Sequence, residues 1–366
     1  MFGLGFSLDI DSYRHIKPIS SPNDLPECVT WYDFTDISTL RKNNDGTSNV
    51  TSNNDRIHWA SNKANGQKLS NFIRSFGSGN DDGVTFKTGG QNGLSYAFIT
   101  DNDGSDTSNL VEGRGLAAGN ITGQDSDNVA WGGDSAGTFS SVKLDMTDMV
   151  VFFIGRNSIV NLLSGQNVQI PYSFQARQEG TTTNTLMYPY IHSSDRFYGF
   201  QTFDGGYTIP INTKNIDENV NLITQIRRDT SINDATIASG EGWASNPEYN
   251  NYVSVKVNGF DNLAFPGWSI FDGTVGDFSI NDQIESMGIT SNAANVPKIS
   301  LGTILIGGDN APDYNNGNPR GAWCGDIYEF VIYNRGLSLE EEYSFMKYVE
   351  NKYNISMEKW PGGFLS

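Results

Sequence analysis

The chain has 366 residues, 37% hydrophobic and 12% aromatic, so it can bury a sizeable core. Its formal net charge of -18 leaves no basic stripe to neutralise phosphates, which argues against nucleic acid and anionic membrane surfaces as partners. Forty glycines, with 21 Phe and 16 Tyr, are typical of short β-strands joined by many turns. We therefore expect an all-β fold.

The first residues match neither a secretion signal nor a membrane anchor. Asp9 breaks the first apolar run, no basic residue precedes that run, and no apolar run approaches the roughly 18 residues that span a bilayer. We therefore expect synthesis in a cytoplasm. Prolines favour extended backbone over residues 1–26, which predicts an arm before a single domain over 27–356 and a short tail over 357–366.

From Cys28 onward, about a dozen apolar runs separated by turn signals have the spacing expected of a sandwich or barrel. In one of them, Val253, Val255 and Val257 share a face. The Asn258-Gly259 pair that follows predicts a two-residue turn into the next strand. The polar stretches 101–141 and 229–250 lack periodicity and are predicted to be surface loops.

The last predicted strand, over 326–335, is apolar on both faces and so must be central and covered. Strand alternation predicts Tyr328, Phe330 and Ile332 on one face, with Ile327, Val331 and Tyr333 on the other. Glu329 is the exception, and a buried carboxylate must be hydrogen-bonded or charge-paired. We assign it a structural role, in which it accepts backbone N–H groups or pairs with Arg335.

A helix is predicted after this strand. Ser338 is a good N-cap, and Glu341 stands three residues on to complete a capping box. The helix also has an apolar stripe that predicts packing on the preceding strand, made of Leu339, Tyr343, Met346, Val349 and Tyr353.

This closing segment, GDIYEFVIYNRGLSLEEEYSFMKYVENKYNI, resembles the end of concanavalin A-like, laminin-G-like jelly-roll domains. The matching positions are Gly325, Asp326, Ile327, Glu329, Ile332, Tyr333, Asn334, Arg335, Leu337, Ser338, Glu341, Lys352 and Tyr353. The stretches CVTWYDFTDISTL and VSVKVNGF also resemble the family, although Phe34 departs from its usual small residue. The resemblance implies an antiparallel jelly-roll β-sandwich with a C-terminal α-helix. Its first and last strands run near each other, so Cys28 and Cys324 are expected to be neighbours, as two buried thiols or one bridge.

The resembled family includes lectins, carbohydrate-binding modules, a few glycosidases and surface-exposed structural proteins, so the fold does not name the function. The Gly-rich start, the Pro-containing arm, the acidity and the Asn-rich loops also resemble, in style, virion structural proteins of tailed phages. This implies a non-enzymatic virion protein, a capsid decoration or a tail component, whose arm docks on other virion proteins in a homo-oligomer. The alternative is a lectin-type module that binds a host-surface glycan.

Sugar recognition requires exposed aromatic rings beside hydrogen-bonding side chains. Two predicted loops offer such residues, which are Trp243, Tyr249 and Asn250 in the first and Asp309, Asp313, Tyr314 and Asn315 in the second. Trp243 in the first loop and Trp323 at the end of the second fit equally well as loop anchors that pack internally.

One acidic stretch, DNDGSDTSNLVE, places oxygen ligands at calcium-loop positions, with Asp101, Asp103, Ser105, Asn109 and Glu112 as the candidate ligands. Asp106 stands where such a loop requires Gly, and neither flank is predicted to be helical, so a solvated acidic turn competes with the calcium loop. We predict no other cofactor.

A glycosidase needs two carboxylates about 5 to 9.5 Å apart. Asp326 and Glu329 come nearest to such a pair, but they stand three residues apart and are predicted to lie on opposite faces of a strand. The three histidines are scattered and suggest neither a zinc site nor a catalytic triad. We therefore predict a protein that is not an enzyme.

Overall fold

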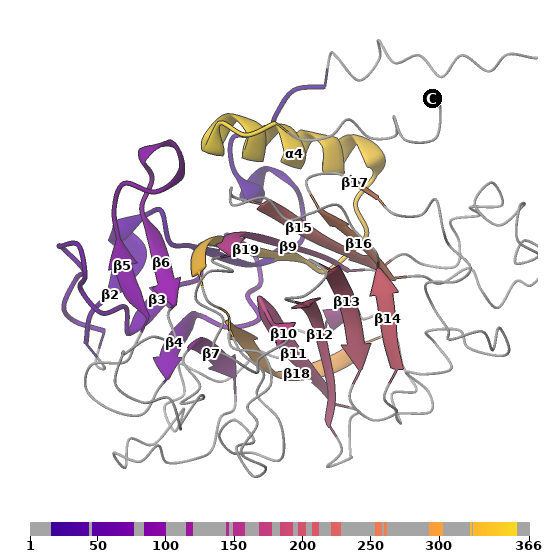
Figure 1. The fold of residues 1–366 in the computed structure, drawn as a ribbon, viewed down its shortest axis with the longest axis horizontal. Coiled ribbons are helices and arrows are strands. Elements are labelled where there is room, and N and C mark those ends of the chain that lie inside the picture. Colours follow the sequence, from indigo (N-terminus) through magenta and orange to yellow (C-terminus); the bar gives the residue numbers. More distant parts are fainter. Residues whose placement is uncertain are drawn as a thin grey trace, which may run out of the picture.

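A computed structural model describes residues 16–43, 46–76, 84–99, 115–119, 144–145, 149–157, 168–177, 184–192, 197–202, 207–211, 221–227, 253–257, 260–261, 293–302, 323 and 325–356. Within these ranges the chain forms two antiparallel sheets and one long helix (Figure 1). The predicted all-β sandwich with a C-terminal helix is therefore confirmed.

The first sheet has eight strands. Their order across the sheet is β17 (Phe260–Asp261), β16 (Val253–Val257), β15 (Asn221–Arg227), β9 (Val150–Asn157), β19 (Gly325–Tyr333), β6 (Tyr96–Ile99) and β5 (Thr85–Lys87), with β1 (Cys28–Asp33) also paired to β19. We call it the helix-side sheet, because α4 (Leu339–Tyr353) lies across its outer face (Figure 1).

The second sheet has eleven strands. Their order is β14 (Tyr207–Ile211), β13 (Phe197–Thr202), β12 (Asn184–His192), β11 (Tyr172–Arg177), β18 (Ala293–Leu301), β7 (Gly115–Gly119), β4 (Phe72–Phe76), β3 (Trp59–Ser61) and β2 (Leu40–Arg41), with β10 (Val168–Gln169) on β12 and β8 (Leu144–Asp145) on β18. Within the described ranges there are also three short 3-10 helices, η1 (Pro22–Asp24), η2 (Ile37–Thr39) and η3 (Gln91–Gly93).

Apolar side chains fill two layers. The first lies between the sheets and joins residues such as Phe153 and Ile332 with Ile73 and Leu116 of the second sheet. The second lies between the helix-side sheet and α4, where the rings of Phe152 and Phe345 stack with centroids 3.7 Å apart. Because β19 is buried along its whole length between these layers, the prediction of a central, covered strand is confirmed.

The alternation of β19 is interrupted by a bulge between Ile327 and Glu329. Ile327 packs between the sheets together with Phe330, whereas Tyr328 packs under the helix with Val331. The sequence prediction had assigned Ile327 and Tyr328 to the opposite layers. That prediction is wrong because a bulge inserts one extra residue and reverses the in-and-out order beyond it.

Helix α4 begins as the sequence predicts. Ser338 Oγ accepts the backbone N–H of Glu341, and the Glu341 carboxylate accepts the backbone N–H of Ser338. Asn354 ends the helix in the left-handed conformation, which Asn tolerates better than most residues. The hairpin predicted at Asn258-Gly259 agrees with the register of β16 and β17, in which Val257 faces Phe260.

Cys28 is a buried, free thiol, which excludes the bridge, one of the two alternatives left open for Cys28 and Cys324. The first and last strands do pair, but antiparallel, with Cys28 opposite Tyr333. This places Cys28 at the opposite end of β19 from Gly325, the neighbour of Cys324 in the sequence.

The part of the predicted arm that the structure describes, residues 16–26, packs on its own chain. The backbone N–H of Ile19 donates to the carbonyl of Ser344, and the hydroxyl of Tyr333 donates to the carbonyl of Pro22 at 2.8 Å. Among the described residues, no helix is long and apolar enough to span a membrane.

Candidate functional site

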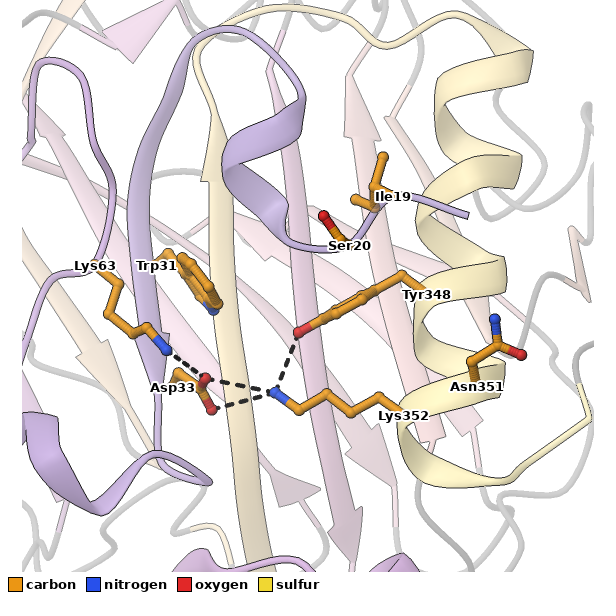
Figure 2. A pocket seen from close by; sticks show the side chains of 8 residues that line it. All are labelled: Ile19, Ser20, Trp31, Asp33, Lys63, Tyr348, Asn351 and Lys352. Carbon is orange, nitrogen blue, oxygen red and sulfur yellow. Dashed lines mark hydrogen bonds and ion pairs between the residues drawn. The ribbon is translucent and has the colours of Figure 1, made fainter. Parts of the chain in front are cut away.

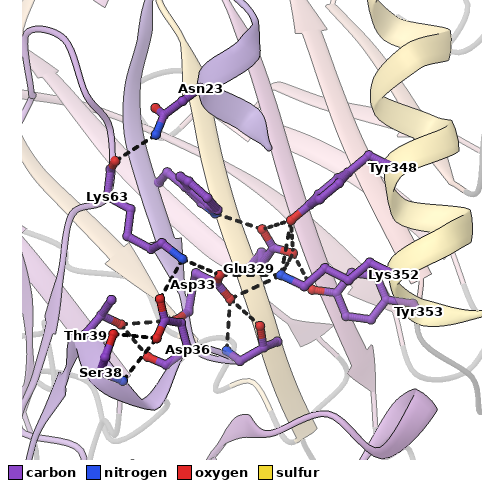
Figure 3. Close-up of polar contacts among 12 residues, drawn as sticks. Asn23, Asp33, Asp36, Ser38, Thr39, Lys63, Glu329, Tyr348, Lys352 and Tyr353 are labelled. Carbon is purple, nitrogen blue, oxygen red and sulfur yellow. Dashed lines mark hydrogen bonds and ion pairs between the residues drawn. The ribbon is translucent and has the colours of Figure 1, made fainter. Parts of the chain in front are cut away.

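The carboxylate of Glu329 lies between the helix-side sheet and α4, where it is fully buried. It accepts the indole N–H of Trp31 at 2.8 Å and the ammonium of Lys352 at 2.7 Å. The hydroxyls of Tyr348 and Tyr353 also donate to it, at 3.0 and 2.5 Å (Figure 3). Burial, with the charge of Glu329 as the second cause, raises the pKa of both tyrosines, which keeps their hydroxyls protonated as donors.

These partners differ from the predicted ones. Glu329 accepts from side chains, and Arg335 instead forms a bidentate ion pair with Glu341, with N to O distances of 2.9 and 2.6 Å. Arg335 follows the end of β19 on the turn into α4, so the carboxylate of the capping box is within its reach. The prediction that Glu329 pairs with Arg335 is therefore wrong.

The bulge in β19 also changes how the two carboxylates are placed. Asp326 stands opposite Arg156 and Glu329 opposite Ile154, and these two partners are alternate residues of β9, so they share a face. Asp326 and Glu329 thus lie on the same, helix-covered face, and the prediction that they lie on opposite faces is wrong. Asp326 is bound to Arg156 at 2.5 Å, and burial raises its pKa to about 6.

This shared face does not make an accessible catalytic pair. Glu329 has no exposed surface and four donors on its two oxygens, while Asp326 is 2% exposed and also accepts the hydroxyl of Tyr328 at 3.4 Å. A general acid or nucleophile must reach its substrate directly. In this arrangement the two carboxylates hold β19 to its neighbours.

A second group of charges adjoins the Glu329 network. The ammonium of Lys63 donates to Asp33 at 2.9 Å and to Asp36 at 2.8 Å, and the ammonium of Lys352 lies 3.4 Å from Asp33 (Figure 3). Although burial opposes the change, hydrogen bonds from Lys63 and Ser38 lower the pKa of Asp36. Lys352 therefore joins two carboxylates, Glu329 and Asp33, into one connected network.

Above this network is a hollow with a volume of about 490 Å³, between the chain that leads into η1 and the last turns of α4 (Figure 2). Two aromatic rings and one aliphatic side chain line it beside carboxylate, ammonium, carboxamide and hydroxyl groups. The lining residues are Ile19, Ser20, Trp31, Asp33, Lys63, Tyr348, Asn351 and Lys352. We call this feature the hollow throughout.

The rim of the hollow carries the groups best placed to meet a ligand. Asn351 is exposed, and its carboxamide has no hydrogen-bond partner within the described part of the chain. Ser20 is exposed too, and its hydroxyl donates to Asp24 while keeping its own lone pairs for an incoming donor. The charged lining residues Asp33, Lys63 and Lys352 are already fixed by ion pairs with one another.

The ligand residues predicted from the sequence lie outside the described residues. This applies to both candidate sugar loops and to the candidate calcium loop, made of Trp243, Tyr249, Asn250, Asp309, Asp313, Tyr314, Asn315, Asp101, Asp103, Ser105, Asn109 and Glu112. Trp323 is described, and it is buried against Phe153 with ring centroids 5.2 Å apart. Where the structure describes the chain, no group of three His, Cys, Asp or Glu side chains is arranged to hold a metal ion.

Most residues of the hollow stand in no sequence pattern that predicts a site. One signal was present, since Trp31 and Asp33 are alternate residues of the predicted first strand and must share a face. The register of β1 on β19 then places Asp33 opposite Glu329. That register and the position of Lys63 come from the fold, which no local pattern gives.

No protein-family model and no curated protein matches this chain. Among solved structures, it is similar to the IT-sialidase CBM40 of Ruminococcus gnavus, with 14% identity over 55% of this chain and 84% of that chain and a TM-score of 0.31. A structure of that CBM40 bound to alpha2,3 sialyllactose also matches, with 14% identity over 56% and 83% and a TM-score of 0.31. Trypanosoma rangeli sialidase in complex with the inhibitor DANA matches with 9% identity over 93% of this chain, 37% of that chain and a TM-score of 0.42. All three scores are below 0.5, which is a distant likeness.

Proposed function

We propose that this protein is a non-enzymatic carbohydrate-binding module built on a β-sandwich, and that the hollow is its sugar site. The observation that carries the proposal is the lining of the hollow, where the half-buried Ile19 and the small exposed parts of Trp31 and Tyr348, 6% and 7% of each residue, meet the polar rim groups of Ser20 and Asn351 in one depression. A volume of about 490 Å³ falls within the range of small-molecule sites.

The polar rim and the aliphatic surface of Ile19 match the chemistry of a sugar, whereas the ammonium groups of Lys63 and Lys352 already lie over the rings of Trp31 and Tyr348. A pyranose ring offers a patch of C–H bonds that packs on aromatic and aliphatic surface, and hydroxyls that both donate and accept. Asn351 supplies a donor and an acceptor from one carboxamide, and Ser20 supplies an acceptor. The hydrogen bonds beneath the hollow hold the ring of Tyr348 in place, so little side-chain entropy is lost when a ligand binds.

Binding without catalysis is part of the proposal. It is supported by the burial of Asp326 and Glu329, because neither carboxylate is open to a substrate. Hydrolysis of a fluorogenic glycoside by the purified protein, lost on Glu329→Gln in a variant that still folds, would contradict this part.

A glycan array followed by titration calorimetry on the best ligand tests the site. Asn351→Ala is expected to weaken binding about three- to ten-fold, the effect of losing one hydrogen bond. Asn49→Ala is the matched control, because Asn49 is also exposed but lies beside β2 of the other sheet, and the affinity of this variant should equal that of the parent.

Two outcomes would count against the proposal. If no glycan binds, the function is wrong. If a glycan binds equally well to Asn351→Ala and to the parent, the hollow is not the site, and Trp243→Ala and Tyr314→Ala then test the loop sites predicted from the sequence.

Calcium assistance is a separate proposal that rests on the sequence of residues 101–112. Calcium is expected to raise the melting temperature of the parent by mass action and to leave Glu112→Gln unchanged. Equal insensitivity of both proteins to calcium and to a chelator would show that this stretch is only an acidic turn.

The virion role and the homo-oligomer predicted from the sequence stay predictions, as does the laminin-G-like family resemblance. Residues 16–26 contact their own chain, through Ile19 and Pro22, and residues 1–15 lie outside the described residues. Light scattering of the parent and of a variant lacking residues 1–15 tests the homo-oligomer. An oligomer that becomes monomeric on truncation would support a particle component, and a monomer in both cases would remove its main support.

A further inference from the structure

The charges at the hollow do not balance. Lys63 and Lys352 bring two positive charges to it. Of the described residues that line it, Asp33 alone carries a carboxylate, so the lining itself has a net charge of +1. Three further carboxylates, Asp24, Asp36 and Glu329, are hydrogen-bonded to lining residues and complete a set of four carboxylates and two ammonium groups. The set therefore has a net charge of -2, within a chain whose own net charge is -18.

Both ammonium groups are already committed to this set. Lys352 donates to Glu329 at 2.7 Å, lies 3.1 Å from the hydroxyl of Tyr348 and also reaches Asp33. Lys63 is shared between Asp33 and Asp36. An anion at either ammonium would have to compete with a carboxylate that is fixed by other hydrogen bonds, such as those from Thr35 to Asp33.

Asp24 adds negative charge at the rim, where a ligand enters. It accepts both the backbone N–H and the hydroxyl of Ser20 at 2.7 Å, and the Ser20 hydroxyl is the larger of the causes that lower its pKa. Asp24 is thus ionised beside one of the two rim groups that are proposed to bind sugar.

We propose that the hollow selects uncharged glycans and discriminates against glycans whose carboxylate or sulfate enters it. This inference rests on the proposed function and names its ligand class. Two like charges about 4 Å apart in water repel by an energy equivalent to about five-fold in affinity. We therefore expect an acidic sugar to bind at least about five-fold more weakly than its neutral counterpart at low salt.

The test uses pairs of ligands that differ only in charge. The neutral glycan found on the array is compared by calorimetry with the same glycan carrying a uronic acid or a sialic acid at its terminus, at about 20 and 300 mM salt. Screening shortens the range of repulsion, so the affinity of the acidic ligand should rise with salt while that of the neutral ligand stays constant.

Asp36→Asn gives the matched variant. Asp36 accepts Ser38 N–H as the N-cap of η2, and Asn keeps that role while removing one charge. It should reduce the ratio between the neutral and acidic affinities by about two-fold or more. Asp55→Asn is the control, because it removes one charge at a turn outside the hollow and should leave the ratio unchanged.

The outcomes separate the two proposals. Absence of binding to every glycan overturns the proposed function, and this inference with it. Binding that favours the acidic member of a pair, or that weakens for the acidic member as salt rises, overturns the inference and leaves the carbohydrate-binding function standing. If the ratio of neutral to acidic affinity is the same for the parent and for Asp36→Asn, these charges do not determine the preference for uncharged glycans.

Discussion

The hydroxyl of Tyr348 donates to the carboxylate of Glu329 at 3.0 Å, across the interface between α4 and β19. Glu329 has no exposed surface, so its charge is stable there only while its four donors stay in place. Three of those donors, from Tyr348, Lys352 and Tyr353, belong to α4. The helix therefore completes the buried polar network as well as covering the sheet.

Glu329→Gln should lower the free energy of unfolding by about 3 kcal/mol, because it breaks a buried ion pair and leaves Lys352 with only the more distant carboxylate of Asp33. The amide also turns one acceptor oxygen into a donor that faces other donors. Urea denaturation measures the loss. Glu340→Gln on the same helix is the control, since Glu340 is exposed and its contribution to the helix dipole is below about 1 kcal/mol. Equal losses in the two variants would contradict the structural role of Glu329.

Phe345 carries the apolar part of the same interface. Its ring is fully buried and stacks on Phe152 at an interplanar angle of 7°. Phe345→Ala should cost about 3 to 5 kcal/mol, and Phe345→Leu less than about half of that, because Leu fills most of the space. Calorimetric unfolding of both variants checks this. A loss below about 1 kcal/mol for Phe345→Ala would mean that α4 is not firmly docked.

Local patterns predicted the local structure well. Ser338 and Glu341 form the capping box, and Val257 faces Phe260 across the predicted hairpin, because these features depend only on neighbours in the sequence. The buried face of α4 is wider than the predicted apolar stripe. Phe345 and Tyr348 are also buried, because the helix lies against both a sheet and the chain before η1.

Long-range features could not be predicted. The bulge at Ile327 and Glu329 has no marker in the sequence, yet it moves Tyr328 to the other layer and brings Asp326 and Glu329 to one face. The hollow likewise combines residues 19 and 20 with residues 351 and 352, which the pairing of β1 with β19 and the hydrogen bond from Ile19 to Ser344 bring together. Such placement depends on register, and register is set by the whole fold.

The thiol of Cys28 should be unreactive in the folded protein. Burial raises its pKa to about 12, and only the thiolate attacks alkylating reagents. In a Cys324→Ser background, iodoacetamide at pH 8 is expected to leave Cys28 unmodified until urea unfolds the chain. Mass spectrometry counts the added groups, and rapid labelling without urea would show that this end of β1 opens.

The raised pKa of Asp326 makes the free energy of unfolding depend on pH. Its folded pKa of about 6 lies above its ordinary value of 3.8, because burial disfavours the charged form more than Arg156 favours it. The folded state therefore binds more protons than the unfolded state between these values, so this group's contribution to stability falls as pH rises through about 6.

Asp326→Asn removes this titration. Relative to the parent, the variant should gain about 1 kcal/mol in free energy of unfolding as pH rises from about 5 to 7, measured by urea denaturation at each pH. Asp55→Asn is the control, because the pKa of Asp55 is already lowered, mainly by the backbone N–H of Thr51, so Asp55 stays ionised throughout this range. If the difference between Asp326→Asn and the parent is the same at every pH, Asp326 is ionised at all of them and Arg156 outweighs the effect of burial.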